Sequence, residues 1–571
     1  MDRGFLSGSA LVSASWQYLE RAIARLLFHD GYTGVRMVGQ TADEGADVLA
    51  HKNGKRWLVQ VKCRKAANVG LDVVDQTLNA AEIYKADIPV IATNQGFTQE
   101  TRQHQMNLLA AGRPLQLWDR RQLVKRWERL PEYPPHVPQV RQYQEGPIRE
   151  VVQRYQGRAS HSALVVMATG LGKTFVAAET VRRLNEALRV PLRVLVLAHR
   201  NELVYQLERA FWPLLKKQTL TSVWNGFETP DPQASLVFAC VDSVAGYLEN
   251  TGGLPAEYDI VVIDECHHAT SPTYMSVIDG LNCGKPGGPF LVGLTATPWR
   301  SDGAHLEGLF GEPAACIDIV QGLKNGWLSN IDYRMHVDNI NWSELGRVRN
   351  LTPRGLNRTL FIDEWDDAVV HKLRDTWSEI DNPRAIVFCG TIDHAVTMRD
   401  RINALGFARA DALYSAGAGG PSISPVQRSR ILCNFHDGVS NILCAVDILN
   451  EGIDLPDVNI VVFQRVTHSR RIFVQQLGRG LRLAEGKKKV IVLDFVSDIR
   501  RFAAGIDLQN QLNSPPSYVS LGNKVRFMTV SGEDKHAEAF LREWLEDVAA
   551  VEAAGEDDNV LKFPPPLAAR R

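Results

Sequence analysis

The sequence lacks the features that would place the protein in a membrane or build a disulfide framework. No apolar run in its 571 residues approaches the ~20 residues of a membrane span. Serine and glycine interrupt the short apolar fragment Ala10–Val12, and charged residues follow it, so the sequence predicts no signal peptide. The eight cysteines include no closely spaced pair of the kind that binds zinc. These absences favour a cytoplasmic protein with reduced thiols.

A surplus of charge of either sign is also missing. The chain holds 64 Lys and Arg against 65 Asp and Glu, a formal net charge of -1. Any affinity for nucleic acid must therefore come from local basic surfaces, since attraction depends on the local field as well as on the total charge. With 45% hydrophobic and 23% charged residues, the composition is that of an ordinary globular protein. The length predicts about three or four domains.

One proline-rich segment, Leu130–Pro138, interrupts any regular structure. Proline removes backbone donors and fixes φ, so this segment predicts a semi-rigid linker. We therefore expect a compact α/β domain at residues 1–128 and a linker at 129–139.

Beyond the linker, short apolar runs alternate with helical patterns in two successive series. Such runs are typical of parallel strands that are buried on both faces and joined by crossover helices. The runs lie at 163–166, 194–197, 236–238, 259–263 and 290–294, and then at 385–388, 441–444, 459–463 and 490–493. The sequence predicts two doubly wound sheets in tandem, in domains at 140–325 and 373–500.

The two remaining segments have weaker patterns. Residues 326–372 contain tryptophans and arginines without an assignable period. We predict a connector there, or part of a track for nucleic acid. Residues 501–571 are predicted to hold one amphipathic helix, at about 535–550, and a flexible tail.

A glycine-rich loop follows the first strand of the first series. Glycines let backbone N–H groups turn toward phosphate, and the start of the next helix adds favourable partial charge. Lys173 would reach the β and γ phosphates, and Thr174 would ligate Mg²⁺. Met167 departs from the strict pattern, which begins with glycine. The predicted nucleotide-binding residues are Thr169, Gly170, Leu171, Gly172, Lys173 and Thr174.

An acidic pair, Asp264 and Glu265, ends the buried strand at 259–263. A carboxylate at the carboxyl end of a strand, across from a phosphate loop, can hold Mg²⁺ through water, and its neighbour can activate the attacking water. We assign the first role to Asp264 and the second to Glu265.

In order and type, these motifs resemble those of superfamily 2 helicases of the DEAD/DEAH (DExH) kind, over about residues 140–495. Gln144 resembles the residue that reads adenine. The resemblance implies that four residues couple hydrolysis to nucleic acid, namely His199, Arg200, Thr295 and Thr297. The segments 446–454 and 475–482 look like two further motifs of the family, which implies nucleotide-binding roles for Gly452, Asp454 and Gln475.

Two arginines complete this set. Arg479 and Arg482 would reach the γ-phosphate charge only when the cleft between the domains closes, as arginine fingers do. Within the superfamily, the loop and the Asp-Glu-Cys-His-His segment resemble the motor subunits of type I and type III restriction enzymes more than DEAD-box RNA helicases.

The N-terminal domain carries a second candidate site. A turn delivers Asp47, and Gln60 and Lys62 share one face of a strand, because alternate strand residues point to the same side. Asp47, with the carbonyl of Val61, would hold Mg²⁺, and Lys62 would orient water or balance developing charge.

This stretch resembles the Mrr-type restriction endonucleases of the PD-(D/E)xK group over about residues 15–128. Glu20 matches the acid of the family's first helix. Gln60 stands where the wider group has a carboxylate, which weakens attraction for a metal, although glutamine is common in the Mrr subset. The fold implied for the chain is a restriction-endonuclease-like domain followed by two RecA-like parallel-sheet domains, all α/β.

Three functions remain open from the sequence. The first is an ATP-dependent DNA helicase or translocase coupled to Mg²⁺-dependent endonuclease cleavage of double-stranded DNA, in restriction or antiviral defence. The second keeps the motor, with an N-terminal domain that binds DNA without cutting, in repair or remodelling. The third is an ATP-switched nucleic-acid sensor or scaffold. No S-adenosylmethionine loop or NPPY-like segment occurs, so a methyltransferase or specificity partner would be a separate chain.

Overall fold

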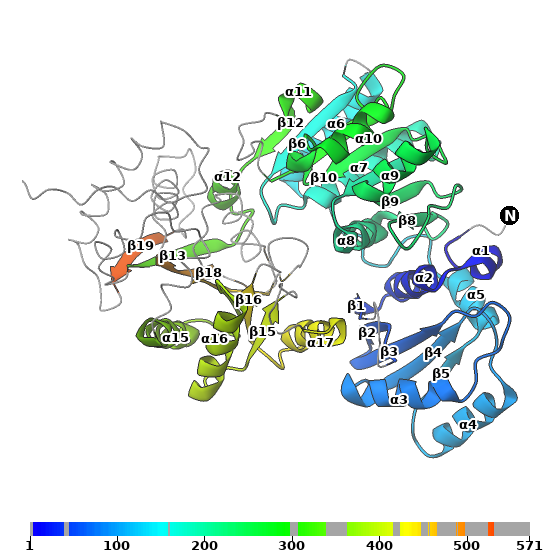
Figure 1. Ribbon diagram of the computed structural model, residues 1–571, viewed down its shortest axis with the longest axis horizontal. Coiled ribbons are helices and arrows are strands. Elements are labelled where there is room, and N and C mark those ends of the chain that lie inside the picture. The colour runs from blue at the N-terminus through cyan, green and yellow to red at the C-terminus, as the bar shows by residue number, and fades with distance from the viewer. Residues whose placement is uncertain are drawn as a thin grey trace, which may run out of the picture.

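A computed structural model gives the arrangement of the chain. It describes residues 4–38, 45–157, 160–296, 306–337, 363–414, 423–446, 455, 457–464, 483, 487, 489–496 and 524–529. Three bodies are visible in Figure 1, each built around one sheet with helices on its faces. We call them the N-terminal domain and the first and second RecA-like domains.

The N-terminal domain has a mixed sheet in the order β1-β2-β3-β4-β5. Its strands are β1 (Thr33–Met37), β2 (Val48–Lys52), β3 (Lys55–Lys62), β4 (Ile88–Thr93) and β5 (Gln116–Trp118). Its helices are α1 (Gly8–Ser13), α2 (Trp16–His29), α3 (Asp72–Ile83), α4 (Gln99–Ala110) and α5 (Arg120–Arg129). β2 and β3 form an antiparallel hairpin. Asn53 and Gly54 connect them with positive φ, the conformation that an Asn-Gly hairpin turn requires.

The first RecA-like domain has a parallel sheet in the order β12-β6-β11-β10-β7-β9-β8. Its strands are β6 (Ser162–Met167), β7 (Val194–Ala198), β8 (Thr221–Trp224), β9 (Leu236–Cys240), β10 (Ile260–Asp264), β11 (Phe290–Thr295) and β12 (Pro313–Ile317). Its main helices are α6 (Gln142–Gly157), α7 (Lys173–Leu188), α8 (Asn201–Phe211), α9 (Val241–Thr251), α10 (Pro272–Gly280), α11 (Glu307–Phe310) and α12 (Ile319–Lys324). All five apolar runs predicted here are strands, and the RecA-like fold is confirmed.

The second RecA-like domain also has a parallel sheet, in the order β15-β16-β14-β17-β18-β13-β19. Its strands are β13 (Asn330–Val337), β14 (Ala385–Phe388), β15 (Ala410–Tyr414), β16 (Ile442–Val446), β17 (Ile460–Phe463), β18 (Lys489–Val496) and β19 (Lys524–Thr529), and its helices include α15 (Asp363–Trp377), α16 (Ile392–Leu405) and α17 (Pro425–His436). The four apolar runs predicted for this sheet are strands as well.

Two strands differ from the sequence prediction. β13 falls in the predicted connector and β19 in the predicted tail, yet both pair in the second sheet. β13 does not read as a buried strand because it contains Asp332 and Arg334, which are nevertheless buried. They form an ion pair at 2.9 Å, and Arg334 also pairs with Glu379 of the same domain. Pairing satisfies the buried charges, so a strand of mixed composition can lie inside the sheet. The predicted helix at 535–550 lies outside the described residues.

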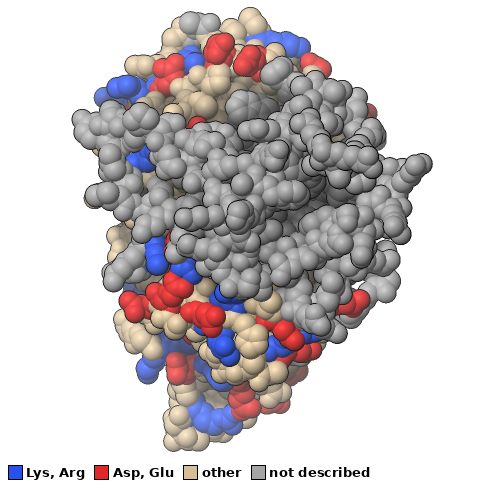
Figure 2. Space-filling view, turned by 90° about the vertical axis from the view of Figure 1, so that its left-hand side faces the viewer, with Lys and Arg blue, Asp and Glu red and all other residues tan. Residues whose placement is uncertain are grey.

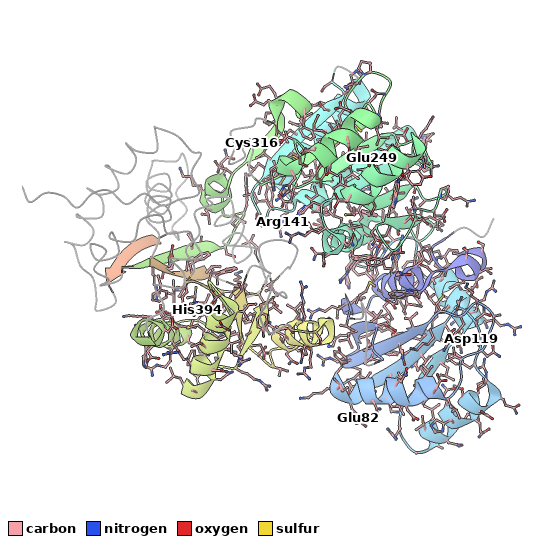
Figure 3. The ribbon with its side chains drawn as sticks, in the orientation of Figure 1. Glu82, Asp119, Arg141, Glu249, Cys316 and His394 are labelled. Atoms are coloured by element: carbon pink, nitrogen blue, oxygen red, sulfur yellow. The ribbon has the colours of Figure 1, made fainter. Side chains whose placement is uncertain are left out.

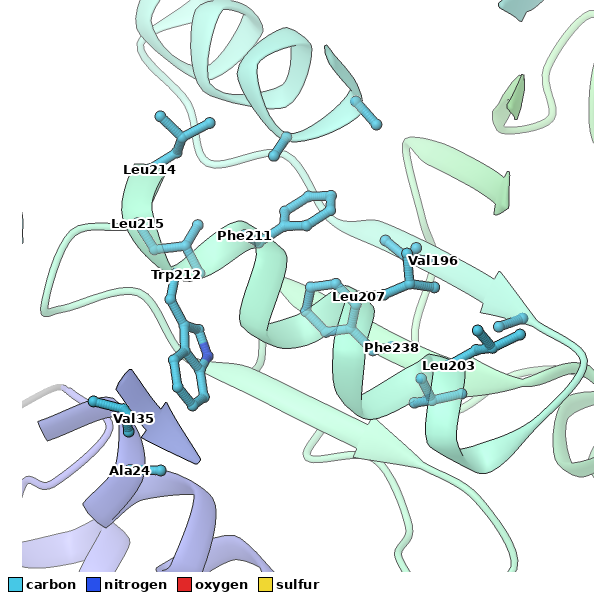
Figure 4. Close-up of a cluster of buried hydrophobic side chains, with 14 of the residues drawn as sticks. Ala24, Val35, Val196, Leu203, Leu207, Phe211, Trp212, Leu214, Leu215 and Phe238 are labelled. Carbon is cyan, nitrogen blue, oxygen red and sulfur yellow. The ribbon is translucent and has the colours of Figure 1, made fainter. Parts of the chain in front are cut away.

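The N-terminal domain packs on the first RecA-like domain through a shared hydrophobic core. The indole of Trp212 extends from the end of α8 toward Val35 and Ala24 of the N-terminal domain (Figure 4). Beside this contact lies a buried ion-pair network, in which Arg21 Nε is 2.9 Å from Glu208 Oε2 and Arg21 Nη1 is 2.5 Å from Glu228 Oε1. The two domains therefore meet over apolar and paired charged groups.

The proline-rich segment between α5 and α6 contains no helix or strand. It is nevertheless fastened to the first RecA-like domain. Lys217 Nζ donates to the carbonyls of Glu128 at 2.8 Å and Leu130 at 2.7 Å, and the Lys217 amide donates to the carbonyl of Glu132 at 2.8 Å.

Two features of the described residues, the surface charge and the hydrophobicity of the helices, relate to expectations from the sequence. On the face shown in Figure 2, basic and acidic side chains are interspersed over the described surface instead of gathering into one patch. Among the described residues, no helix is long and apolar enough to cross a membrane.

Candidate functional sites

The glycine-rich loop connects β6 to α7. Gly170 and Gly172 have φ of 94° and 87°, a region that side chains disfavour, and Lys173 is the first residue of α7. The loop and the helix N-terminus thus have the local geometry of a phosphate cradle. Lys173 is buried, and its Nζ lies 3.9 Å from Glu265 Oε1. The structure brings the predicted phosphate lysine and the predicted catalytic acid together.

The helix before the loop contacts it directly. Gln144 on α6 accepts from the Arg141 amide at 3.0 Å and donates to the Leu171 carbonyl at 2.9 Å. The neighbouring Tyr143 stacks on Trp327, with ring centroids 4.7 Å apart. Arg141 lies on the side of the first RecA-like domain that faces the second (Figure 3). The stack was not predicted, because nothing in the sequence relates a tyrosine before the loop to a tryptophan after the last strand of the sheet.

The acidic pair lies at the carboxyl end of β10. Asp264 is the last residue of the strand, and Glu265 has a positive φ of 49°. A non-glycine residue in this region is strained, and such strain concentrates at functional sites. Burial, and next the Glu265 carboxylate, raise the pKa of Asp264 to about 7.

Histidines link the acidic pair to neighbouring strands. His267 Nδ1 lies 3.3 Å from Glu265 Oε2 and 3.4 Å from Thr295 Oγ1 at the end of β11. His268 packs against His199, which follows β7, with ring centroids 4.6 Å apart. Arg200 is the N-cap residue of α8. The predicted coupling residues Thr295 and His199 thus contact His267 and His268, which directly follow the acidic pair and Cys266.

The remaining predicted motor residues lie outside the described residues. These are Thr297, Gly452, Asp454, Gln475, Arg479 and Arg482.

The N-terminal candidate site forms at the open end of the β2–β3 hairpin, where β2 begins and β3 ends. Asp47 is buried just before β2, and its amide donates to the Val59 carbonyl at 3.1 Å. Its Oδ2 accepts from the Val61 amide at 2.5 Å. The carboxylate is therefore held against β3 between Gln60 and Lys62.

Gln60 is fully buried and its amide is satisfied by its neighbours. With its oxygen toward Lys62, it accepts from Lys62 Nζ at 2.9 Å, and its nitrogen donates to the Val73 carbonyl at 3.2 Å and to Thr77 Oγ1. The amide oxygen thus contacts the ammonium where a carboxylate would otherwise do so. Thr77 was not predicted as a site residue.

Glu20 is buried on α2, which packs against β2 and β3. Burial, and next the Glu20 carboxylate, raise the pKa of Cys63, the residue after Lys62. The structure therefore collects Glu20, Asp47 and Lys62 in one region of the N-terminal domain.

The two regions differ in how well they fit a divalent cation. At the glycine-rich loop, the donors are the Asp264 carboxylate and the Thr174 hydroxyl, and a cation there would relieve the repulsion between Asp264 and Glu265. In the N-terminal domain the acids are Asp47 and Glu20, with an amide at position 60. Among the residues that the structure describes, no group of three or more His, Cys, Asp or Glu side chains is arranged to hold a metal. Asp264 and Glu265 lie in the first region and Asp47 and Glu20 in the second, so the two regions differ mainly in the amide that Gln60 places in the second.

The fold and these sites define a helicase-type motor joined to an endonuclease-type domain. Residues 11–127 match the family described as Restriction endonuclease (Mrr catalytic domain). Residues 138–300 match Type III restriction enzyme, res subunit, and residues 368–484 match Helicase conserved C-terminal domain. The chain therefore combines an Mrr-type endonuclease domain with both domains of a superfamily 2 motor, as the resemblance implied.

Two relatives from Escherichia coli are similar to most of the chain. The type I restriction enzyme EcoAI endonuclease subunit is 26% identical over 559 residues, covering 86% of this chain and 65% of the relative. The type I restriction enzyme EcoKI endonuclease subunit, from strain K12, is 25% identical over 464 residues, covering 71% and 38%. This chain thus spans less than two thirds of the length of either relative.

The fold is also similar to that of a solved restriction enzyme. The ATP-dependent Type ISP restriction-modification enzyme LlaBIII bound to DNA has a TM-score of 0.52 and 16% sequence identity, covering 95% of this chain and 42% of that chain.

Proposed function

We propose that the protein is an ATP-dependent DNA translocase that cuts double-stranded DNA with Mg²⁺ in a restriction or defence system. The observation that carries the proposal is the presence in one chain of a phosphate loop beside an acidic pair and of Asp47 beside Lys62. In this proposal the domains follow the predicted division, except that β13 and β19 belong to the second RecA-like domain.

In the motor, residues 169–174 hold the ATP phosphates, and Thr174 and Asp264 hold Mg²⁺. Bound Mg²⁺ supplies charge that offsets the negative charge developing on the phosphates. Glu265 orients and deprotonates the attacking water, and its proximity to Lys173 keeps the base next to the reacting phosphate. Arg479 and Arg482 complete the site from the second RecA-like domain. His267 and His268 connect the acidic segment to Thr295 and His199. Thr295 and His199 couple ATP hydrolysis to movement of the DNA.

In the N-terminal domain, Asp47, with the carbonyl of Val61, would hold Mg²⁺, which would polarise the scissile phosphate, and Glu20 of α2 would be a further acid of the site. Lys62 orients the attacking water or balances charge, and Gln60 fixes the Lys62 ammonium by accepting its hydrogen bond. Gln60 is therefore a positioning residue in this proposal.

A second candidate function is supported by the amide at position 60. Because it removes one negative ligand, the N-terminal domain would bind DNA without cutting it, and the protein would be a translocase in repair or remodelling. Both candidates place the protein in the cytoplasm, with DNA and a separate methyltransferase or specificity subunit as partners.

The test is cleavage of plasmid DNA by purified protein with Mg²⁺, with and without ATP, beside Lys173→Ala and Asp47→Ala. The proposal expects cutting that requires ATP, Lys173 and Asp47, and ATP hydrolysis that survives Asp47→Ala. DNA-stimulated ATP hydrolysis without cutting supports the second candidate. Hydrolysis that DNA does not stimulate supports an ATP-switched sensor or scaffold.

A further inference from the structure

Both RecA-like domains hold the same strand of the N-terminal domain. Arg209 on α8 donates from Nη2 to the carbonyl of Val35 in β1 at 2.6 Å. Ser429 on α17 donates from Oγ to the carbonyl of Val38, directly after β1, at 3.0 Å. Figure 1 shows α17 between the second RecA-like domain and β1 and β2. β1 therefore bridges two bodies that an ATP-driven motor moves relative to each other.

Val38, which accepts the hydrogen bond from α17, is also hydrogen-bonded to Asp47, the candidate metal ligand. The Val38 amide donates to the carbonyl of Asp47 at 2.9 Å. Two hydrogen bonds, one on each side of Val38, thus connect Ser429 of the second RecA-like domain to Asp47.

Apolar side chains also connect α17 to the residues next to Asp47. The buried side chain of Cys433 on α17 packs in a cluster with Val38 and Ala46, and Ala46 directly precedes Asp47. The rest of the cluster comes from the N-terminal domain, namely Leu49, Leu58, Ala80 and Tyr84. An ion pair between Arg56 and Asp437, the residue after α17, closes this contact. A movement of α17 therefore acts on Val38 and on Ala46, the residue before Asp47.

Among the described residues, the contact with the first RecA-like domain contains a buried ion-pair network, whereas the Arg56–Asp437 pair to the second is partly exposed. The first RecA-like domain is joined through Trp212, through the buried Arg21 network and through Arg25, which donates to the carbonyls of Thr219 and Lys216 at 2.9 and 3.0 Å. When the RecA-like domains move relative to each other, the N-terminal domain stays with the first RecA-like domain. The contact between α17 and the N-terminal domain is then the one that changes.

We propose that α17 is a positioning element for the nuclease site: it holds Val38 and so fixes Asp47, and movement of the second RecA-like domain changes metal binding there. Ser429, Cys433 and Asp437 are positioning residues, since they act on Asp47 through residues of the N-terminal domain. This inference rests on the proposed function and adds a route by which the ATP cycle controls cutting.

The experiment compares Asp437→Arg, Ser429→Ala and the swap Asp437→Arg/Arg56→Asp. The controls are Asp367→Arg, which breaks an ion pair with Arg401 inside the second RecA-like domain, and Ser378→Ala, which removes an exposed hydroxyl in that domain. The readouts are the Mg²⁺ concentration for half-maximal plasmid cleavage, the cleavage rate at saturating Mg²⁺, ATP hydrolysis, and hydrogen exchange of the peptide containing residues 33–47.

We expect Asp437→Arg and Ser429→Ala to raise the half-maximal Mg²⁺ concentration about fivefold, the effect of one net hydrogen bond. The saturated cleavage rate and ATP hydrolysis should stay as in wild type, as should both controls. Exchange at 33–47 should quicken in Asp437→Arg and return toward wild type in the swap. A non-hydrolysable ATP analogue should change this exchange in wild type and not in Asp437→Arg.

The exchange measurement separates this inference from the proposed function. If wild-type protein does not cut DNA, the nuclease proposal fails, and exchange still reports whether α17 fixes the Asp47 segment. Equal exchange in wild type and Asp437→Arg, with and without the analogue, would overturn the inference whether or not the protein cuts.

Discussion

Arg21 and Glu208 form a buried ion pair that joins the N-terminal domain to the first RecA-like domain. Glu228 pairs with the same guanidinium, and Thr221 donates to Glu208 at 2.6 Å. Although burial alone lowers it, the two carboxylates raise the pKa of Arg21. The two carboxylates thus hold the guanidinium in place. Without it, they would be buried with no compensating positive charge.

Arg21→Met should therefore destabilise the docked protein by about 3–5 kcal/mol, the usual cost of removing one member of a buried charge pair. Urea unfolding followed by tryptophan fluorescence measures the change. Arg102→Met is the matched control, because it breaks an ion pair in which Arg102 is 48% exposed, and it should cost less than about 1 kcal/mol. Equal losses in both variants would refute the role given to the network.

Gly172→Ala should abolish most ATP hydrolysis. The backbone φ of 87° disfavours any side chain, and the added Cβ would meet Gln144 Nε2 at 2.7 Å. The loop or α6 must shift, which displaces the N–H groups that face phosphate. Gly246→Ala on α9 is the control, since nothing lies within 4 Å of its added Cβ. DNA-stimulated ATP hydrolysis measures both, and full activity in Gly172→Ala would contradict the phosphate-loop assignment.

Gln60→Glu should lower the stability of the N-terminal domain in EDTA by about 1–3 kcal/mol, because the new carboxylate cannot donate to the Val73 carbonyl that the amide nitrogen now faces. Thermal unfolding in EDTA is the measurement, with Gln103→Glu on the exposed side of α4 as the control. Unchanged stability would show that the amide donor is not needed. Adding Mg²⁺ should recover part of the loss if the carboxylate joins Asp47 as a ligand.

His29 predicts a pH dependence of stability. It is fully buried, and burial, followed by Arg25 and Lys217, lowers its pKa from 6.5 to about 3. The unfolded chain thus binds a proton between these values that the folded protein does not, so stability falls as the pH falls below 6.5. At pH 5 the loss is about 2 kcal/mol relative to pH 7.

His29→Phe should remove that part of the acid sensitivity, because phenylalanine does not titrate and fits between Phe5 and Phe28. Urea unfolding at pH 7 and pH 5 tests this, with the exposed His136→Phe as control. The same loss of stability at pH 5 in His29→Phe as in wild type would contradict the prediction.

The sequence predicted the parts of the fold that depend on local pattern. Continuous apolar runs such as Val194–Leu197 are fully buried strands, because a parallel sheet covered on both faces selects such runs. β13 was missed because its buried charges are satisfied by Glu379, which lies far along the chain. At the sites, spacing predicted which residues gather near Lys173 and Asp47. It could not predict the contact of α17 with Val38, since that depends on how separate domains pack.

The contacts of the linker show which interactions hold the N-terminal domain to the first RecA-like domain. Lys217 donates to the carbonyls of Leu130 and Glu132 in the connecting segment and of Glu128 near the end of α5. Trp212, Arg21 and Arg25 join the N-terminal domain itself to the first RecA-like domain. Covalent continuity through the prolines therefore adds little to attachment. A protease cut among these residues would leave a nicked complex that stays assembled, and the two halves, expressed separately, would find each other through the same surfaces.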